Sequence, residues 1–402
     1  MTRDLGPRQM NRLRVIEMLY RHPASSRTDL ARMTGLSRAT VSALVEELGH
    51  AGVVEEHDAP DAIGPRPTGR PPVALSLVAG AGFAVGLDFG HQHIRVAICD
   101  LSGELVAEDW SPAEVDHAPT ESLDLAHELV RASLSIAGIE HERLLGVGMG
   151  LAAPIDRATG AIAPDGILPG WSGIRPAAEM QARLGVQVEL ENDANVGALG
   201  EKVFGAARGV DDLIYVRLSA GIGAGLILGG RLYRGANGTA GEIGHVLVDD
   251  QGPLCRCGNR GCLETYAGAH ALLELLGRAH GALDVQEMVE LASAGDAACQ
   301  RVVADAGRVV GVTMAALCNQ FNPERVVVGG ELAATGDLLL EPLRDAVRRY
   351  ALPAAAEAVT IVAGELGDRA ELLGALVLVV GQSDRALSGR VRAAVGGRQP
   401  IP

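Results

Sequence analysis

The chain has 402 residues, of which 48% are hydrophobic and 21% are charged, and its formal net charge is −15. This composition supports a sizeable buried core, so the chain as a whole is not a disordered tail. The length suits two or three domains. The acidic excess excludes a protein that coats nucleic acid over its whole surface. No apolar run approaches the roughly 20 residues of a membrane span, and the first residues lack an apolar signal core, so we expect a cytoplasmic protein without membrane contact.

The charge is unevenly distributed along the chain. Residues 1–80 carry ten arginines and nine acidic residues, a balance of +1, which leaves −16 for the other 322 residues. A near-neutral head on an acidic body indicates that only the head is suited to DNA phosphates. We therefore predict a DNA-binding domain at residues 1–80.

Residues 8–50 show the pattern of three short helices. Apolar residues at helical spacing predict the first helix over 8–21. Thr28 is placed to cap a second helix, and Ser37 is placed to cap a third helix that runs to about His50. An ordinary three-helix bundle that does not bind DNA is one interpretation of this pattern.

The spacing between the second and third helices favours a helix-turn-helix instead. Ala31, Gly35 and Val41 fall at offsets 0, 4 and 10. The small residue lets the helices approach, the glycine allows a left-handed turn, and the β-branched residue packs beneath the recognition helix. The side chains predicted to reach phosphates and base edges in a major groove are Ser37, Arg38, Thr40 and Ser42.

Two short apolar segments after the third helix predict a hairpin wing. The strands are expected at residues 53–56 and 73–77, and the loop at 64–72 is rich in glycine and proline. Such a stiff loop can lay Arg70 into a narrow A/T-rich minor groove. The same loop is also typical of an interdomain linker, and the two interpretations are compatible.

From Phe83 the sequence alternates between strands and helices, in two similar halves. Strands at 83–87 and 94–99 flank a turn in the first half, and strands at 214–218 and 225–228 flank a turn in the second. This duplication predicts two α/β lobes with a cleft between them. The predicted boundaries are 81–190 for the first lobe, completed by a C-terminal helix at about 368–395, and 191–367 for the second.

Three turns in the body could offer backbone N–H groups to a phosphate. Each is a weak signal alone, because most glycine-rich turns only reverse the chain. The candidate nucleotide-binding residues are Asp88, Gly90, Gly221, Gly223, Gly329 and Gly330.

Polar residues follow the predicted strand at 186–190. Asn192 and Asp193 come at its carboxyl end, where ligands of α/β sheets commonly bind. A carboxylate at this place can accept a hydroxyl proton from a sugar. The same two residues can also cap the predicted helix at 194–204.

One histidine and three closely spaced cysteines predict a metal site. His245, Cys255, Cys257 and Cys262 can close a tetrahedral zinc site that supports structure and leaves no position for a reactive water. The alternative is three unrelated buried thiols. Glu242 and Glu264 flank this set, and a backbone fixed by zinc would hold them ready to bind the hydroxyls of a hexose.

Together these motifs resemble the ROK family of repressors, open reading frames and kinases. The matching stretches are Glu191–Asn195, Gly241–His245 and the cysteine segment up to Glu264, together with Leu168–Trp171. The resemblance implies an α/β two-lobed fold like those of actin and hexokinase-type sugar kinases, behind an N-terminal winged helix-turn-helix. It also implies a homodimer or a dimer of dimers. It implies zinc at His245, Cys255, Cys257 and Cys262, sugar contacts at Asn192, Asp193, Glu242, His245 and Glu264, and Asp193 as the general base of kinase members.

The chain departs from the kinases of this family where phosphates would bind. Those kinases have Gly-Thr in the first turn where this chain has His91 and Gln92, and Glu331 adds negative charge after the third turn. Ile167 stands where kinases often have asparagine. These changes indicate a vestigial site for ATP and Mg²⁺, because phosphoryl transfer depends on positioning and charge neutralisation.

The prediction is therefore a sugar-responsive transcriptional regulator, a repressor that binds operator DNA through its head. A sugar or sugar phosphate in the body is expected to release it from DNA. Asp88 and Asp193 remain in place, so an ATP-dependent hexose kinase is the main alternative. A DNA-binding regulator whose body senses a partner protein is the third interpretation.

Overall fold

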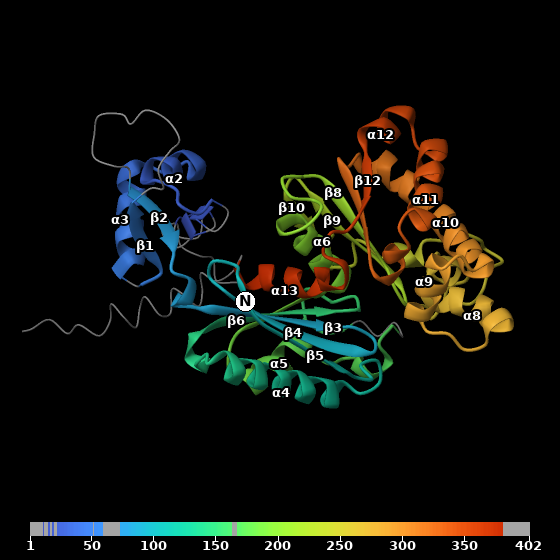
Figure 1. Cartoon of the computed structure of the whole chain (residues 1–402), viewed down its shortest axis with the longest axis horizontal. Helices are drawn as coiled ribbons and strands as arrows, with labels where there is room; N and C mark the ends of the chain where they lie inside the picture. The colour runs from blue at the N-terminus through green and yellow to red at the C-terminus, as the bar shows by residue number, and fades with distance from the viewer. Residues whose placement is uncertain are drawn as a thin grey trace, which may run out of the picture.

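Three β-sheets organise the chain into a small head and two α/β lobes (Figure 1). In this computed structural model the described residues are 11, 15–16, 18–19, 22–50, 52–58, 73–162 and 167–380. The two-lobed α/β fold behind a helix-turn-helix region confirms the predicted fold class. The exact domain boundaries stay predictions.

The head contains helices α2 (Arg27–Thr34) and α3 (Arg38–His50) and an antiparallel hairpin of β1 (Val54–Asp58) and β2 (Val73–Leu77). Its core is apolar and fully covered, and Gly35 takes the left-handed conformation expected of the turn, with φ +70°. The hairpin confirms the predicted wing strands. The wing tip, with Arg70, lies outside the described residues.

The start of α2 differs from the prediction. Ser26, not Thr28, caps this helix, because its hydroxyl accepts a hydrogen bond from the Asp29 amide while the Asp29 side chain accepts one from the Ser26 amide. This reciprocal capping box satisfies two amide groups that a lone Thr28 cap would leave open. Thr28 lies inside the helix.

The first lobe is a five-stranded sheet in the order β5-β4-β3-β6-β7, in which β3, β4 and β5 are antiparallel and β6 and β7 run parallel to β3. One face packs against α4 (Pro119–Ala137) and α5 (Pro176–Leu184), and the other packs against α13 (Ala370–Val380). The strands are β3 (Phe83–Phe89), β4 (His93–Asp100), β5 (Leu105–Pro112), β6 (Leu144–Leu151) and β7 (Val188–Asn192).

The second lobe repeats this topology, with the order β10-β9-β8-β11-β12 and the same strand directions. Helix α6 (Asp193–Val203) covers one face of its sheet, and helices α7 to α12 cover the other. The strands are β8 (Leu213–Leu218), β9 (Ile222–Leu228), β10 (Arg231–Tyr233), β11 (Arg325–Gly329) and β12 (Thr360–Ala363). The helices are α7 (Glu264–Ala267), α8 (Ala269–His280), α9 (Val285–Ser293), α10 (Ala297–Phe321), α11 (Asp337–Tyr350) and α12 (Pro353–Ala358).

Two helices cross between the sheets at very short range (Figure 1). A Cβ atom added at Gly374 of α13 would lie 1.7 Å from the Val196 carbonyl oxygen of α6, and one added at Gly200 would lie 2.3 Å from the Ala370 carbonyl oxygen. Only glycine permits this approach. The prediction of a C-terminal helix at about 368–395 overlaps α13, and its part beyond residue 380 lies outside the described residues.

Helix α10 is the one described helix whose length and composition would suit a membrane span. Half of its most apolar window is buried inside the protein. It lies against α11, and Cβ atoms added at Gly307 and Gly311 would come within 2.6 Å of the α11 backbone. Burial against α11 is typical of a core helix.

A short connector, residues 78–82, joins the head to the first lobe. The Val78 amide donates to the Val53 carbonyl in the head (2.9 Å), and the Leu101 amide of the body donates to the Ala79 carbonyl (3.2 Å). One continuous apolar cluster contains Leu75 and Leu77 of the head and residues of the first sheet and α13. The head therefore packs directly on the first lobe (Figure 1).

Candidate functional site

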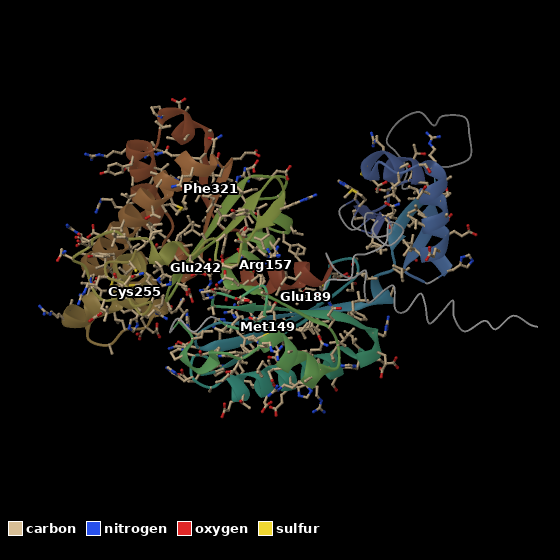
Figure 2. The ribbon with its side chains drawn as sticks, turned by 180° about the vertical axis from the view of Figure 1, so that it is seen from behind. Met149, Arg157, Glu189, Glu242, Cys255 and Phe321 are labelled. Atoms are coloured by element: carbon tan, nitrogen blue, oxygen red, sulfur yellow. The ribbon has the colours of Figure 1, made fainter. Side chains whose placement is uncertain are left out.

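All five residues predicted to contact sugar line one cleft at the carboxyl ends of β6 and β7. Figure 2 shows Glu242 where the two lobes meet, with Cys255 farther out on the second lobe. Residues after β6, including Ala153, and Ile167 complete the apolar part of the wall. The five polar residues are Asn192, Asp193, Glu242, His245 and Glu264.

The junction of β7 and α6 orients Asn192 and Asp193. The Asn192 side chain accepts a hydrogen bond from the Asn195 amide (3.2 Å) and so caps α6. Oδ1 of Asp193 accepts from the Ala194 amide (2.8 Å) and the Asn192 side-chain amide (2.9 Å). These contacts leave Oδ2 of Asp193 as the oxygen available to a ligand.

Glu191 is a supporting residue for this junction. Its carboxylate accepts a hydrogen bond from the Asn195 side chain (2.9 Å) and forms an ion pair with Arg234. It lies in the segment Glu191–Asn195 singled out above, but no role was predicted for it from the sequence. Arg234 is 43 residues away, so local spacing carries no signal of the pair.

The cleft concentrates carboxylates at close range. Burial, together with the nearby carboxylates of Asp193 and Glu264, raises the pKa of Glu242 to about 7. At neutral pH both the protonated and the ionised form of the Glu242 carboxyl are therefore present. It can accept a hydrogen bond from a ligand hydroxyl or donate one to it.

Arg217, on β8, is a cleft residue that the sequence analysis missed. Its Nη1 lies 3.3 Å from Oδ2 of Asp193, and its Nε donates to Oε1 of Glu371 on α13 (3.1 Å). The Tyr215 hydroxyl donates to the same Glu371 oxygen (2.9 Å). Glu371 is 154 residues from Arg217, so only the tertiary fold reveals this network.

The four predicted metal ligands are brought together. The Cys257 and Cys262 sulfurs are 3.7 Å apart, and the Cys255 sulfur is 3.5 Å from Nδ1 of His245. All four ligand atoms lie within 4.8 Å of one another. A tetrahedral ion with zinc–sulfur bonds of about 2.3 Å places its sulfurs about 3.8 Å apart, so this set fits such an ion.

The chain curls around the ligand cluster through two glycines. Gly258 and Gly261 have φ values of +91° and +63°. A Cβ atom at Gly261 would lie 1.5 Å from the Asp249 carbonyl oxygen. The other three cysteines, Cys99, Cys299 and Cys318, are also buried, and Cys299 lies beside Asp296 and His280.

Glu264 belongs to both the cluster and the cleft. Its Oε1 lies 3.0 Å from the Cys255 sulfur, and its side chain lines the cleft beside Asn192 and Asp193. It is the first residue of α7 and lies two residues after Cys262. Order in the metal loop therefore sets the position of one wall of the cleft.

The predicted phosphate turns border a second cavity of about 420 Å³. His91 and Glu331 line it, as the departures from the kinase pattern suggest. Nε2 of His93 lies 3.1 Å from Oδ2 of Asp88, and Oδ1 of Asp88 is buried with no hydrogen-bond partner among the described residues. Histidines thus occupy space beside the first turn.

Packing alone accounts for several of the turn glycines. A Cβ atom at Gly90 would lie 2.3 Å from the His93 ring, one at Gly329 would lie 2.2 Å from the Tyr215 hydroxyl, and one at Gly330 would lie 2.3 Å from the Leu218 carbonyl oxygen. Gly221 and Gly223 line the first cleft, next to Glu264 and Ala194. A nucleotide role for these glycines stays a prediction.

On the head, the predicted recognition residues fall into two groups. The Ser37 hydroxyl accepts a hydrogen bond from the Thr40 amide (3.1 Å) and contacts the Thr40 hydroxyl, so these two residues order the start of α3. Arg38 and Ser42 are exposed on the same helix. Their side chains are free to face a DNA groove.

Comparison with known proteins matches both parts of the chain. The ROK family profile matches residues 84–382, and the MarR family profile matches residues 4–62. The chain is 32% identical over 387 residues to the xylose repressor of Caldicellulosiruptor bescii, covering 93% of this chain and 96% of the relative. In this family, the His245, Cys255, Cys257 and Cys262 cluster is typical of a zinc site.

Two solved structures are similar to different portions of the chain. A ROK family transcriptional regulator, described as a homologue of the E. coli MLC protein, matches with a TM-score of 0.80 and 25% identity, over 96% of this chain and 98% of that one. A ROK family glucokinase from Streptomyces griseus, solved with glucose and AMPPNP, matches with a TM-score of 0.64 and 30% identity. It covers 74% of this chain and 99% of its own. The kinase thus corresponds to only part of this chain, whereas the regulator matches almost all of it.

Proposed function

From the premise that this chain belongs to the ROK family and is a transcriptional repressor of that family, we propose that a neutral sugar bound in the cleft weakens its hold on operator DNA. The observation that carries the proposal is the convergence of Asn192, Asp193, Glu242, His245 and Glu264 on one cleft. Because a repressor acts on operators in the chromosome, its location is the cytoplasm.

The chemistry of the cleft favours a neutral ligand over a sugar phosphate. Three of its polar groups are carboxylates, from Asp193, Glu242 and Glu264, and they suit the hydroxyl donors of a sugar. The same carboxylates repel a phosphate, and the two arginines that line the cleft, Arg217 and Arg256, already face Asp193 and Glu264. The names of the repressor relatives make D-xylose the first ligand to test, and the apolar Ile167 wall suits a sugar with few polar groups on that side.

The head supplies operator recognition. Helix α3 is the recognition helix, with Arg38 and Ser42 directed to a major groove, supported by Ser37 and Thr40 at its first turn. Arg70, in the loop that the sequence predicts between the wing strands, serves the minor groove. Two heads of a homodimer then read the two halves of a palindrome.

A structural zinc ion completes the body. His245, Cys255, Cys257 and Cys262 would hold it, and the closed ligand set gives it no catalytic position. Its role is to order the loop that ends at Glu264. The cleft is therefore built for binding and not for metal-assisted chemistry.

The test measures operator affinity with and without sugar. A duplex selected from a random library by the wild-type protein is labelled, and its Kd is measured by fluorescence anisotropy with D-xylose, D-glucose and glucose 6-phosphate. A neutral sugar should weaken operator binding by about 5- to 150-fold, and Asp193→Asn should abolish this response. Equal operator affinity with and without every sugar would contradict the proposal.

The kinase alternative is decided by a coupled assay of ADP release with the same sugars. His91 and Gln92 stand in place of the Gly-Thr of the family kinases, so ADP release should not exceed that of Asp193→Ala. Turnover well above this control would show that the body is an active kinase.

A further inference from the structure

Arg217 connects the first turns of two helices that cross between the lobes. Asp193 is the first residue of α6, and Glu371 lies in the first turn of α13. The Arg217 guanidinium lies within 3.3 Å of both carboxylates. All three side chains are almost fully buried, so water screens their charges only weakly.

A ligand at Asp193 must compete with this arginine. Oδ1 of Asp193 already accepts two hydrogen bonds, from the Ala194 amide and the Asn192 side chain. Oδ2, which is left for a sugar hydroxyl, is the oxygen that faces Arg217. A hydroxyl that donates to Oδ2 therefore weakens the Arg217–Asp193 contact and shifts the guanidinium toward Glu371.

Helix α13 extends this contact toward the head. Leu372, the residue after Glu371, lies in the apolar cluster that also contains Leu75 and Leu77 of the head, as does Leu376 one turn later. The Gly374 backbone touches Val196 of α6, so the two helices cannot move independently at the crossing. A change at the start of α13 therefore acts on the packing beneath the head.

We propose that Arg217 and Glu371 form a relay that transmits occupancy of Asp193 to α13 and through it to the DNA-binding head. Arg217 and Glu371 are positioning residues in this relay: Arg217 acts on the ligand through Asp193, and Glu371 acts on the head through α13. This inference rests on the proposed function, because it assigns a route to the response of that same cleft.

Two variants separate the charge of Glu371 from its hydrogen bonds. Glu371→Gln keeps the shape and an acceptor oxygen for Tyr215 and Arg217 but removes the charge that Arg217 faces. Tyr215→Phe is the matched control, because it removes the hydrogen bond to the same Glu371 oxygen and leaves the ion pair intact. Thermal melting confirms that both variants are folded.

Both variants and the wild type are titrated with D-xylose by calorimetry and with the selected operator by anisotropy. D-xylose should bind Glu371→Gln within about threefold of wild type, whereas the sugar-induced change in operator Kd should shrink at least about fivefold. Without sugar, Glu371→Gln should already change operator Kd by about threefold or more. Tyr215→Phe should behave as wild type in all three measurements.

The outcomes separate the relay from the proposed function. A wild-type response that Glu371→Gln retains in full overturns the relay and leaves the proposed function standing. If D-xylose and D-glucose change nothing in the wild type, the proposed function fails, and the sugar-free measurement decides the relay. In that case, a sugar-free operator Kd for Glu371→Gln equal to that of wild type overturns the relay. Where the wild type does respond to sugar, a loss of response in Tyr215→Phe equal to that in Glu371→Gln also overturns the relay.

Discussion

At the scale of single residues, the buried indole of Trp171 is held by specific partners. Trp171 is completely buried, its indole N–H donates to the Val115 carbonyl (2.6 Å), and its ring meets Phe89 edge-on at 5.9 Å. It follows Ile167 by four residues, so it anchors the segment that forms the apolar wall of the cleft. A residue with these contacts stabilises both the first lobe and the ligand site.

Trp171→Phe should therefore lower the free energy of unfolding by about 1–3 kcal/mol, because the buried Val115 carbonyl loses its donor. Denaturant unfolding followed by circular dichroism measures the change. Trp110→Phe is the control, since Trp110 is 61% exposed, and it should change stability by less than about 0.5 kcal/mol. Equal effects of the two substitutions would contradict the role given to Trp171.

The metal ligands make a second prediction at this scale. Removal of the ion with a chelator, or Cys257→Ser, should loosen residues 245–262 and weaken sugar binding together, because Cys255 and Glu264 are in contact. Hydrogen exchange of the loop and calorimetry with D-xylose measure the two effects. Cys318→Ser, at a buried thiol outside the cluster, should leave sugar binding unchanged. Full sugar affinity in the metal-free protein would show that the cleft does not depend on the loop.

Whether a site residue could be predicted depended on how far its partners lie along the chain. The metal ligands lie within 18 residues of one another, and the spacing of three of them within eight residues is specific enough to read directly. Arg217 and Glu371 are 154 positions apart, and Arg234 and Glu191 are 43 positions apart. No periodicity in the sequence indicates pairs at such separations. Ser26 was missed because a threonine two residues later has the same chemistry.

At the scale of elements, glycines decide how closely the central helices approach. The predicted strands at 83–87, 94–99 and 214–218 match β3, β4 and β8 closely. Strand β6 was not predicted, because its sequence carries Gly146, Gly148 and Gly150, which are unfavourable in an isolated strand. A Cβ atom at Gly148 would lie 1.8 Å from the Ala375 carbonyl oxygen, so the fold requires this glycine for the approach of α13.

Strand β5 was missed for a different reason. Its residues alternate between partly buried and exposed, and it forms the edge of the first sheet. An edge strand needs few apolar residues, so its hydrophobic signal is weak. The short β10 lies at the corresponding edge of the second sheet and was missed as well.

The crossing of α6 and α13 gives a prediction at this scale. Gly374→Ala should destabilise the protein by about 1–3 kcal/mol or more, because the added methyl group would meet the Val196 carbonyl at 1.7 Å. Gly277→Ala is the matched control in α8, where nothing lies within 4 Å of the added atom, and it should stabilise the protein by up to about 1 kcal/mol. Denaturant unfolding of both variants checks the pair. If Gly374→Ala left the free energy of unfolding unchanged, the two helices would be able to separate easily.

At the scale of the whole molecule, the head and the first lobe share one apolar cluster. Leu372→Ala, in the body, should cost about 2–5 kcal/mol and also raise amide exchange in α2 and α3 of the head. Leu340→Ala is the control in α11, since this leucine is equally buried but belongs to the core of the second lobe. It should destabilise its own lobe and leave exchange in the head unchanged. Unaltered head exchange in Leu372→Ala would show that the two parts are independent.

The connector at residues 78–82 has a consequence for how operators can be arranged. It is hydrogen-bonded to the head through Val78 and to the body through Ala79, and a Cβ atom at Gly82 would lie 2.6 Å from the Leu145 side chain, so it is too tightly packed to absorb a rotation of the first sheet. In a dimer, each head would then be held in a fixed position on its body. The distance between the two heads would therefore determine which spacing, and so which helical phase, the two half-sites must have. Changing the length of this junction should therefore alter which spacings the protein accepts while leaving the base preference of each half-site intact.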